Sequence, residues 1–346
     1  MIRIEGLTKK FDGTLALDGL DMNVPDGSVY GLVGTNGAGK TTIIKHLAGV
    51  WRQDKGTIRY DDEDIWENEA LKSRIGVIHD DLYFPSGYTL KDMGRMYRSA
   101  YPCWNEERFH EMTRIMKLDE RKRVSAFSKG MKKQAMFSLV MSTMPDYLLL
   151  DEPLDGLDPI VRKLVWKFLI DDVADRGMTV LVSSHNLKDM EEICDHIGII
   201  SNGKMVLERD LDTIKTSLHK IQVSFGNIGS IGVSVQGAAG KTASDNAKTA
   251  ADTAGDNSDT GLSSAAENNA AQDQAAAFDP YKGLNILHRE TRGTVDLMII
   301  DNDIEEAREI INRNDPVLFD ILPLSLEEVF IYELGGENDE IRKLVF

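Results

Sequence analysis

The stretch from Gly34 to Thr41, GTNGAGKT, constrains the fold of this chain more than any other segment. A short apolar run before it, Val29 to Val33, predicts a buried strand, and the apolar spacing from Thr41 to Val50 predicts a helix. Glycines between a strand and a helix let backbone amides and the positive helix end converge on an anion. We therefore predict a phosphate-binding loop here; the alternative is an ordinary glycine-rich strand–helix turn.

The spacing Gly34-x4-Gly39-Lys40-Thr41 matches the Walker A pattern G-x4-G-K-[ST]. In that pattern the lysine reaches the β- and γ-phosphates of a nucleotide, and the hydroxyl ligates Mg²⁺. A second segment, Tyr147 to Leu150, predicts a buried strand that ends in Asp151 and Glu152. In a P-loop enzyme the first carboxylate supports the Mg²⁺ shell, and the adjacent one can polarise an attacking water. Paired acidic residues at a strand end are common, so this signal gains its weight from the loop.

Strands and helices alternate along the first two thirds of the chain. Further strands are predicted at 179–183 and 197–200, with a helix at 160–175, which indicates a largely parallel sheet covered by helices. Residues 90–145 are mostly helical in pattern. We predict an α/β P-loop nucleotide hydrolase over residues 1–212, with a helical subdomain at about 80–145.

The last third differs in composition. From Gln236 to Ala277 small and polar residues dominate, and Leu262 is the only large apolar side chain. Such a segment buries too little surface to offset its ordering entropy, so we predict a disordered insertion at 236–278. Strands predicted at 220–225, 284–288 and 295–300 and a helix at 304–312 flank it. Residues 213–346 should therefore form a small accessory α+β domain around the insertion.

Charge and composition narrow the functional classes. The chain has 57 acidic and 40 basic residues and a net charge of −17, which argues against nucleic acid as a partner, since such binding neutralises phosphates with lysine and arginine. Only Cys103 and Cys194 are present, as in proteins of a reducing cytoplasm. No uncharged apolar run approaches the roughly 20 residues that cross a bilayer, and no signal peptide is recognisable. A cytoplasmic protein is expected.

Three further motifs carry a resemblance to a known family. Ser128-Lys129-Gly130-Met131 occupies the place of the signature motif of ABC ATPases, upstream of Asp151. The segment from Asp151 to Pro159, DEPLDGLDP, resembles the family's Walker B motif and D-loop. His185, in VSSH, matches the switch histidine at the end of the next strand. The resemblance covers about residues 1–210, in the family's order and spacing.

The resemblance implies a role for each matching residue. Phe11 would stack on adenine; the alternative is an ordinary packed aromatic in a turn or core. Asp151 would support Mg²⁺, Glu152 would act as general base, and His185 would contact the γ-phosphate. The phosphates and metal would be held by Gly34, Asn36, Gly37, Ala38, Gly39, Lys40, Thr41 and Thr42, with Lys40 also assisting catalysis. Ser128 and Gly130 would close on the ATP bound by the opposite subunit.

Two departures from the family pattern stand out. Asp80 occupies the slot of the Q-loop glutamine, where a carboxylate could also bind Mg²⁺. Lys129 replaces the first glycine of the signature motif, while Ser128 and Gly130 remain. Similar variants occur in drug, bacitracin or ABC-2 exporter-type ATPases.

The resemblance implies an ATPase that uses ATP and Mg²⁺, pairs with an identical or different second ABC ATPase subunit, and powers a separate membrane permease. The permease would dock around Tyr83, Phe84 and Tyr88 and would hold the chain at the inner face of the cell membrane. The resemblance favours export over import. The alternative is a non-transport ABC ATPase acting on ribosomes or DNA, which a single cassette and the acidic charge disfavour. The C-terminal region could regulate the ATPase or bind a ligand. Within it, Leu326 to Phe330, LEEVF, resembles the tail of exporter-type ATPases, or is an amphipathic packing helix.

Overall fold

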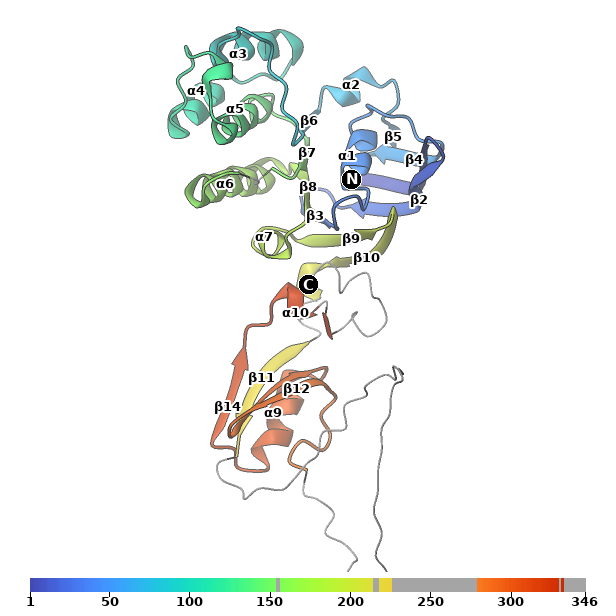
Figure 1. Cartoon of the computed structure of the whole chain (residues 1–346), viewed down its shortest axis with the longest axis vertical. Helices are drawn as coiled ribbons and strands as arrows, with labels where there is room; N and C mark the ends of the chain where they lie inside the picture. The colour runs from blue at the N-terminus through green and yellow to red at the C-terminus, as the bar shows by residue number, and fades with distance from the viewer. Residues whose placement is uncertain (154–155, 214–217, 226–278, 330, 333–346) are drawn as a thin grey trace, which may run out of the picture.

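The computed structural model describes residues 1–153, 156–213, 218–225, 279–329 and 331–332. The predicted insertion at 236–278 lies outside the described residues, as do Leu154 and Asp155 of the D-loop segment and Phe330. The described strands form three sheets, two in the N-terminal part and one in the C-terminal part (Figure 1).

The central sheet has six strands in the order β10-β9-β3-β8-β7-β6. Its members are β3 (Val29–Val33), β6 (Ile75–Ile78), β7 (Tyr147–Asp151), β8 (Thr179–Ser184), β9 (His196–Ser201) and β10 (Lys204–Asp210). All pairs are parallel except β9 with β10. Every residue of β3, β7 and β8 is buried, as expected for strands covered on both faces. The predicted α/β class with a largely parallel sheet is confirmed.

A second, antiparallel sheet covers the first helix. Its order is β2-β1-β4-β5, with β1 (Ile2–Phe11), β2 (Thr14–Val24), β4 (Lys55–Tyr60) and β5 (Glu63–Asp64). Inward residues such as Ile2, Ile4 and Met22 share one hydrophobic core with Ile43 and Ile44 of α1 (Lys40–Leu47). The same core includes Leu149 and Leu181 of the central sheet. Helix α1 is therefore fixed from both sides, which holds its N-terminus in place.

The helical part begins after β6, and its apolar residues share one core with residues of the central sheet such as Leu148 and Val180. It consists of α3 (Leu90–Ala100), α4 (Glu106–Ile115), the 3₁₀ turn η1 (Val124–Ala126) and α5 (Lys129–Met141), while the short α2 (Glu69–Lys72) precedes β6. Polar side chains start these helices: Thr89 forms a capping box with Asp92, Asn105 caps α4 and Ser128 caps α5. Helix α6 (Pro159–Arg176) follows β7, with Asp158 as its cap. These caps fix where each helix begins, including the one that carries the signature residues.

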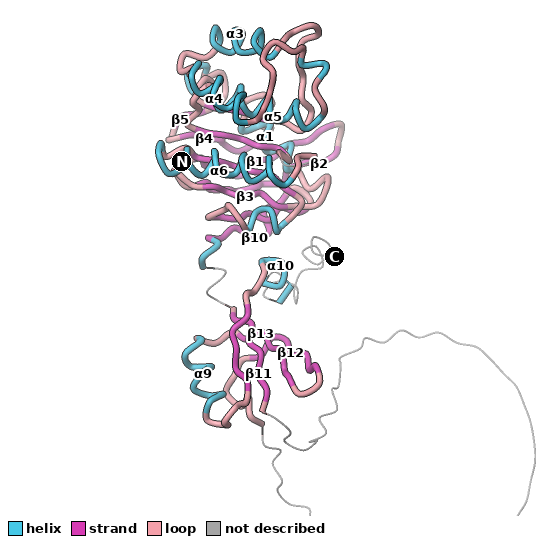
Figure 2. The backbone as a smooth tube through the Cα atoms, turned by 90° about the vertical axis from the view of Figure 1, so that its left-hand side faces the viewer, coloured by secondary structure: helices cyan, strands magenta, loops and turns pink. Residues whose placement is uncertain are grey.

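The C-terminal part is a four-stranded antiparallel sheet with one helix on one side (Figure 2). The sheet order is β12-β13-β11-β14, with β11 (His219–Ser224), β12 (Ile286–Arg292), β13 (Val295–Ile300) and β14 (Leu318–Leu322). Helix α9 (Ile304–Asn312) contributes Ala307 and Ile311 to a small core with Ile221 and Met298. This part therefore has an apolar core of its own.

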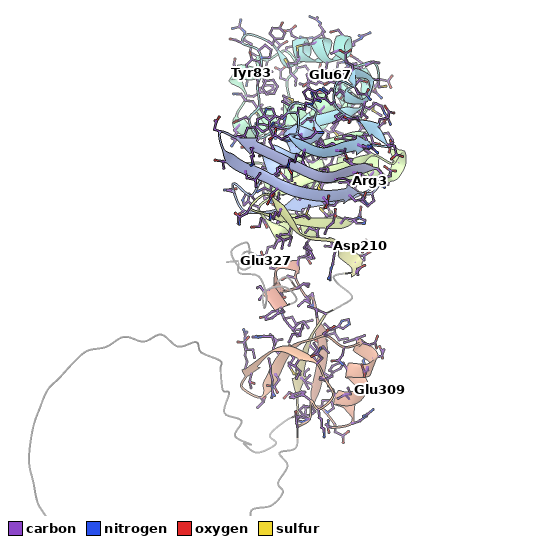
Figure 3. The ribbon with its side chains drawn as sticks, turned by 90° about the vertical axis from the view of Figure 1, so that its right-hand side faces the viewer. Arg3, Glu67, Tyr83, Asp210, Glu309 and Glu327 are labelled. Carbon is purple, nitrogen blue, oxygen red and sulfur yellow. The ribbon has the colours of Figure 1, made fainter. Side chains whose placement is uncertain are left out.

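A short helix, α10 (Leu326–Val329), docks the C-terminal part onto α7 (Leu187–Glu191). Leu326 and Val329 are buried in the large core of the N-terminal part. The Leu326 amide donates to Glu191 Oε2 at 3.3 Å, and Lys188 Nζ lies 3.6 Å from Glu327 Oε2. Figure 3 shows Glu327 at this junction and Tyr83 at the opposite, helical end of the molecule. Among the residues described, no helix is sufficiently long and apolar to traverse a bilayer.

Replacing Leu326 by alanine should weaken this junction. Leu326 is 1% exposed, so the change should lower the free energy of unfolding in urea by about 2–5 kcal/mol. Amide exchange in α7 should also become faster, because α7 loses its cover. Leu287→Ala is the matched control: Leu287 is 40% exposed on β12, and its loss should cost no more than about 0.5 kcal/mol. Equal effects of the two variants, or unchanged exchange in α7, would contradict the observed docking.

Candidate functional site

A cleft of about 440 Å³ opens at the carboxyl ends of the central parallel strands. The loop after β3 and the end of β7 both line it, so the sheet brings distant sequence segments to one edge. Its lining consists of Thr14, Leu15, Ala16, Asn36, Gly37, Gly39, Lys40, Thr41, Thr42, Asp80, Asp151, Glu152, Asn202 and Gly203. Nine of these are residues that the sequence predicted for the site.

The loop after β3 ends at Gly39, whose backbone conformation suits glycine. Its φ is +117°, and a Cβ there would come within 2.9 Å of Leu17 Cδ2. The first helical hydrogen bond of α1 runs from the Ile43 amide to the Gly39 carbonyl at 2.9 Å. The amides of residues 40–42 therefore precede the helical ladder and have no partner within the helix. Together with the helix dipole they make this end of the cleft suitable for an anion.

Lys40 places a nearly buried positive charge in the cleft. Its side chain is 6% exposed, and Nζ donates to the Gly34 carbonyl at 2.7 Å and to the Thr35 carbonyl at 3.3 Å. Nζ also lies 3.3 Å from Glu152 Oε1. The loop carbonyls thus hold the ammonium beside the amides that begin α1, where it adds to their attraction for phosphate.

Two acidic residues lie at the end of β7, Asp151 as its last residue and Glu152 directly after it, and a serine on the adjacent strand contacts both. Ser183 Oγ donates to Asp151 Oδ1 at 2.7 Å and accepts a hydrogen bond from the Glu152 amide at 3.2 Å. Glu152 Oε2 lies 2.9 Å from His185 Nδ1, so the predicted base and the switch histidine are in contact. Glu152 has a left-handed backbone, with φ of +47°. The carboxylate of Glu152 therefore bridges Lys40 and His185, which does not itself line the cleft.

Asp80 enters the cleft from the loop after β6. Its Oδ1 lies 3.0 Å from Nζ of Lys133, a buried lysine on α5. Burial lowers the pKa of the neighbouring His79 imidazole; Lys45 also lowers it, and Asp151 raises it by a smaller amount.

The oxygen donors of the cleft fit the chemistry of Mg²⁺. This ion prefers carboxylate and hydroxyl oxygens, keeps several waters, and commonly takes only one or two protein carboxylates together with substrate phosphates. Thr41, Asp80 and Asp151 all line the cleft and offer such oxygens. Within the described ranges, no group of three histidine, cysteine, aspartate or glutamate side chains is placed to hold a metal.

Several predicted residues lie outside the lining of this cleft. Gly34 supports the loop because its carbonyl accepts a hydrogen bond from Lys40 Nζ, and Ala38 packs in the core. The Phe11 ring packs edge-on against Trp51, with the two ring centroids 4.8 Å apart. The residues of β2 that follow it in the hairpin, Thr14 to Ala16, line the cleft. Ser128 is exposed at the start of α5, and Gly130 lies beside Gly156, the backbone oxygen of which would be 3.2 Å from an added Cβ. The structure does not bring Ser128 and Gly130 to the cleft of their own chain.

The sequence did not identify the β9–β10 turn as part of the site. Gly203 donates its amide to the Ala38 carbonyl at 2.9 Å and accepts from the Asp18 amide at 3.0 Å. The turn thus ties the loop before α1 to strand β2. The dipeptide Asn202-Gly203 is a recognisable hairpin signal, but no local pattern reveals where the hairpin packs.

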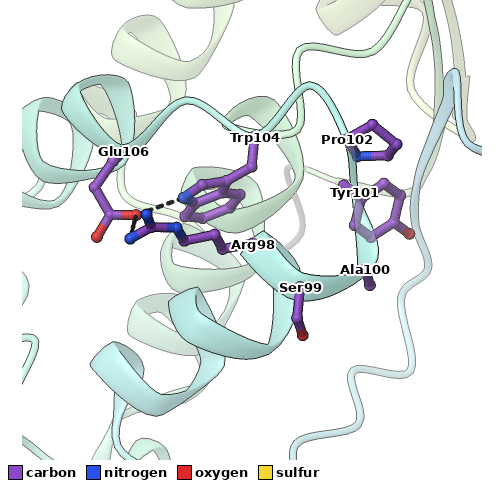
Figure 4. A pocket seen from close by; sticks show the side chains of 7 residues that line it. All are labelled: Arg98, Ser99, Ala100, Tyr101, Pro102, Trp104 and Glu106. Carbon is purple, nitrogen blue, oxygen red and sulfur yellow. Dashed lines mark hydrogen bonds and ion pairs between the residues drawn. The ribbon is translucent and has the colours of Figure 1, made fainter.

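Another hollow lies far from these groups in sequence, on the helical part. It measures about 350 Å³ and is lined by residues 98–102, Trp104 and Glu106. Figure 4 shows the Trp104 indole donating to Glu106, at 2.6 Å, beside Arg98. It lacks the lysine, loop amides and paired carboxylates of the central cleft, so the central cleft is the candidate site.

Comparison with known proteins agrees with this assignment. The family model for ABC transporters matches residues 17–155. The ABC transporter ATP-binding protein YtrB of Bacillus subtilis is 28% identical to this chain, over 98% of the chain and 99% of YtrB. The daunorubicin/doxorubicin resistance ATP-binding protein DrrA of Streptomyces peucetius is 35% identical, over 63% of this chain and 67% of DrrA.

Solved structures show the same similarity. The structure of an ATP-binding subunit of an ABC transporter matches with a TM-score of 0.58 and 26% identity, covering 62% of this chain and 92% of its own. The exporter-type resemblance drawn from the motifs is confirmed by the DrrA match. The chain belongs to the ABC transporter family, as an ATP-binding cassette subunit that hydrolyses ATP.

Proposed function

We propose that this chain powers a separately encoded membrane permease, as the ATPase subunit of an exporter. The observation that carries the catalytic part is the chain of contacts from Lys40 through Glu152 to His185 at the cleft, each within hydrogen-bonding or ion-pair distance. Export is supported by the similarity to DrrA, a drug-resistance ATP-binding protein. The permease would hold the chain at the inner face of the cell membrane.

The residues of the cleft divide the work of hydrolysis. The amides of residues 36–42 and the Lys40 ammonium bind the β- and γ-phosphates and stabilise the charge that develops on them. Glu152 takes a proton from the attacking water, and His185 holds the Glu152 carboxylate and contacts the γ-phosphate. Mg²⁺, held by Thr41 and Asp151 with Asp80 nearby, would neutralise charge on the phosphate oxygens. Phe11 remains the candidate for contact with adenine, at the edge where Thr14 to Ala16 line the cleft.

A second cassette would complete each nucleotide site. Ser128 is exposed at the N-terminus of α5, and Gly130 is half-buried just after it. An exposed hydroxyl and a helix N-terminus suit a phosphate brought by another molecule. We assign them to the ATP of a partner cassette, identical or different, so that two ATP molecules hold the closed dimer together.

The permease surface is placed on the segment between Asp80 and α3. Tyr83 is 80% exposed there, and Tyr88 and Met96 are exposed nearby. The segment starts at Asp80 in the cleft, so a partner bound at Tyr83 lies only three residues along the chain from the nucleotide site. Exposed aromatic side chains are typical anchors of protein interfaces.

For the chain as a whole, we propose a nucleotide-binding domain at residues 1–212 and an accessory domain at 213–346. The accessory domain contacts α7, which begins two residues after His185. This contact favours a regulatory role for the accessory domain. The Leu326→Ala variant should therefore alter the ATPase rate, whereas Leu287→Ala should not.

Glu152→Gln tests the assignment of the general base. The variant should bind ATP but hydrolyse it at least about 100-fold more slowly, because an amide cannot accept the proton of water. It should also accumulate as a dimer in the presence of ATP, which size-exclusion chromatography measures. The control is Glu107→Gln on the exposed surface of α4. Normal turnover by Glu152→Gln would rule out this base.

Gly203→Ala tests whether the β9–β10 turn shapes the cleft. Its φ is +76°, and an added Cβ would lie 2.4 Å from the Ala16 carbonyl oxygen, so the turn must move away from β2 and the loop. ATP affinity, measured by calorimetry with Mg²⁺, should fall about tenfold, equivalent to about 1.4 kcal/mol.

Gly293→Ala is the matched control for this change. Gly293 lies in the β12–β13 hairpin with φ of +66°, and nothing lies within 4 Å of an added Cβ. An alanine at residue 293 has the same unfavourable left-handed backbone, which costs about 1 kcal/mol, but no clash. This variant should leave ATP affinity unchanged. An unchanged affinity in Gly203→Ala would remove the turn from the site.

Affinity purification from detergent-solubilised membranes tests the partner. The full chain should bring down a membrane protein with several spans, and the double variant Tyr83→Ser, Tyr88→Ser should recover much less of it while its ATPase activity remains. Val317→Ser, at a site 76% exposed on the accessory domain, is the control and should recover as much as the unchanged chain. Recovery of ribosomal or DNA complexes instead would favour the non-transport alternative.

A further inference from the structure

We propose that Lys133, on helix α5, is a positioning residue that holds the backbone of Glu152 in the same chain. It would also balance the charge of Asp80 beside the phosphate site. This inference rests on the proposed role of Glu152 as general base.

The Lys133 ammonium has two oxygen partners from separate segments of the site. Its side chain is 4% exposed on α5. Nζ donates to the Glu152 backbone carbonyl at 2.9 Å and lies 3.0 Å from Asp80 Oδ1. A buried ammonium is costly unless its donors are satisfied, so these two contacts explain how a charge is tolerated there. They also tie the loops after β6 and β7 to α5.

The carbonyl that Lys133 contacts belongs to a strained residue. Glu152 has φ of +47°, in a region that residues other than glycine seldom adopt. Pro153 follows it, and a proline favours an extended conformation of the residue before it. Such a conformation persists only when its surroundings impose it. Here Ser183 holds the Glu152 amide and Lys133 holds its carbonyl, so both peptide groups of Glu152 are fixed.

This backbone determines the direction of the catalytic carboxylate. One Glu152 side-chain oxygen lies 3.3 Å from Lys40 Nζ and the other lies 2.9 Å from His185 Nδ1. If the carbonyl loses its donor, the peptide can rotate toward a relaxed conformation and carry the carboxylate away. A displacement of about 1 Å at a catalytic group can cost as much as 100-fold in rate.

The contact with Asp80 has a separate consequence. Asp80 lines the cleft, and with Lys133 removed its negative charge would face the phosphates without a partner. Repulsion should then weaken ATP binding rather than slow the chemical step. Lys133 therefore contributes to kcat through Glu152 and to KM through Asp80, and the two contributions can be separated.

The test measures steady-state ATPase kinetics of the full chain with Mg²⁺-ATP. Lys133→Met should lower kcat roughly 10- to 100-fold and raise KM. Adding Asp80→Asn to it should return KM toward the original value while kcat stays low, because the Glu152 carbonyl still lacks its donor. Lys133→Arg keeps the charge and donors and should retain most of kcat. A residue that only stabilises the fold would not divide kcat from KM in this way.

Controls separate this inference from the proposed function. Lys167→Met makes the same substitution on the exposed face of α6 and should change neither constant. If Lys133→Met does not fold, as judged by circular dichroism, Lys133→Leu, which likewise has no donor, takes its place with the same expectations. Unchanged kcat in these variants, or kcat restored by Asp80→Asn, overturns the role of Lys133. Normal turnover by Glu152→Gln would instead overturn the base assignment itself.

Discussion

The buried ammonium of Lys40 is the charge around which the cleft is organised. It lies over the loop carbonyls of Gly34 and Thr35 and pairs with Glu152, which in turn contacts His185. A cation held in a largely dehydrated position interacts strongly with phosphate, because little water screens it. The position depends on α1, which is packed between the antiparallel sheet and the central sheet. The rigidity of the core is thus what makes the charge useful for binding and hydrolysis.

Around this centre, the less obvious residues act by holding other groups. Ser183 contacts both acidic residues at the end of β7, Asp151 and Glu152, and Gly203 ties the loop before α1 to β2. Lys133 reaches the same backbone from α5, while Ser128 begins that helix and is exposed. In the proposed dimer, α5 would present the Ser128 hydroxyl to a partner cassette at its start and would support Glu152 of its own chain about one and a half turns later.

The accessory domain reaches the catalytic region through packing. Leu326 and Val329 enter the core of the N-terminal part. Lys220, on strand β11, places its Nζ 2.6 Å from Oε1 of Glu328 on α10. Because α10 rests on α7, and α7 begins just beyond His185, movement of the accessory sheet would reach the neighbourhood of His185. Coupling of this kind needs no change in the nucleotide-binding residues themselves.

The sequence by itself determined the parts of the site that are local. A glycine loop between a strand and a helix, and two acids at the end of a buried strand, follow from backbone geometry and periodicity over a few residues. The lining by Asn36, Gly37, residues 39–42, Asp151 and Glu152 could therefore be predicted. Tertiary structure alone decided that Gly203 supports the loop, that Lys133 contacts Glu152 and Asp80, and that Phe11 packs on Trp51. Such contacts join residues far apart in the chain, and their partners are fixed by how sheets and helices pack, which no local pattern records.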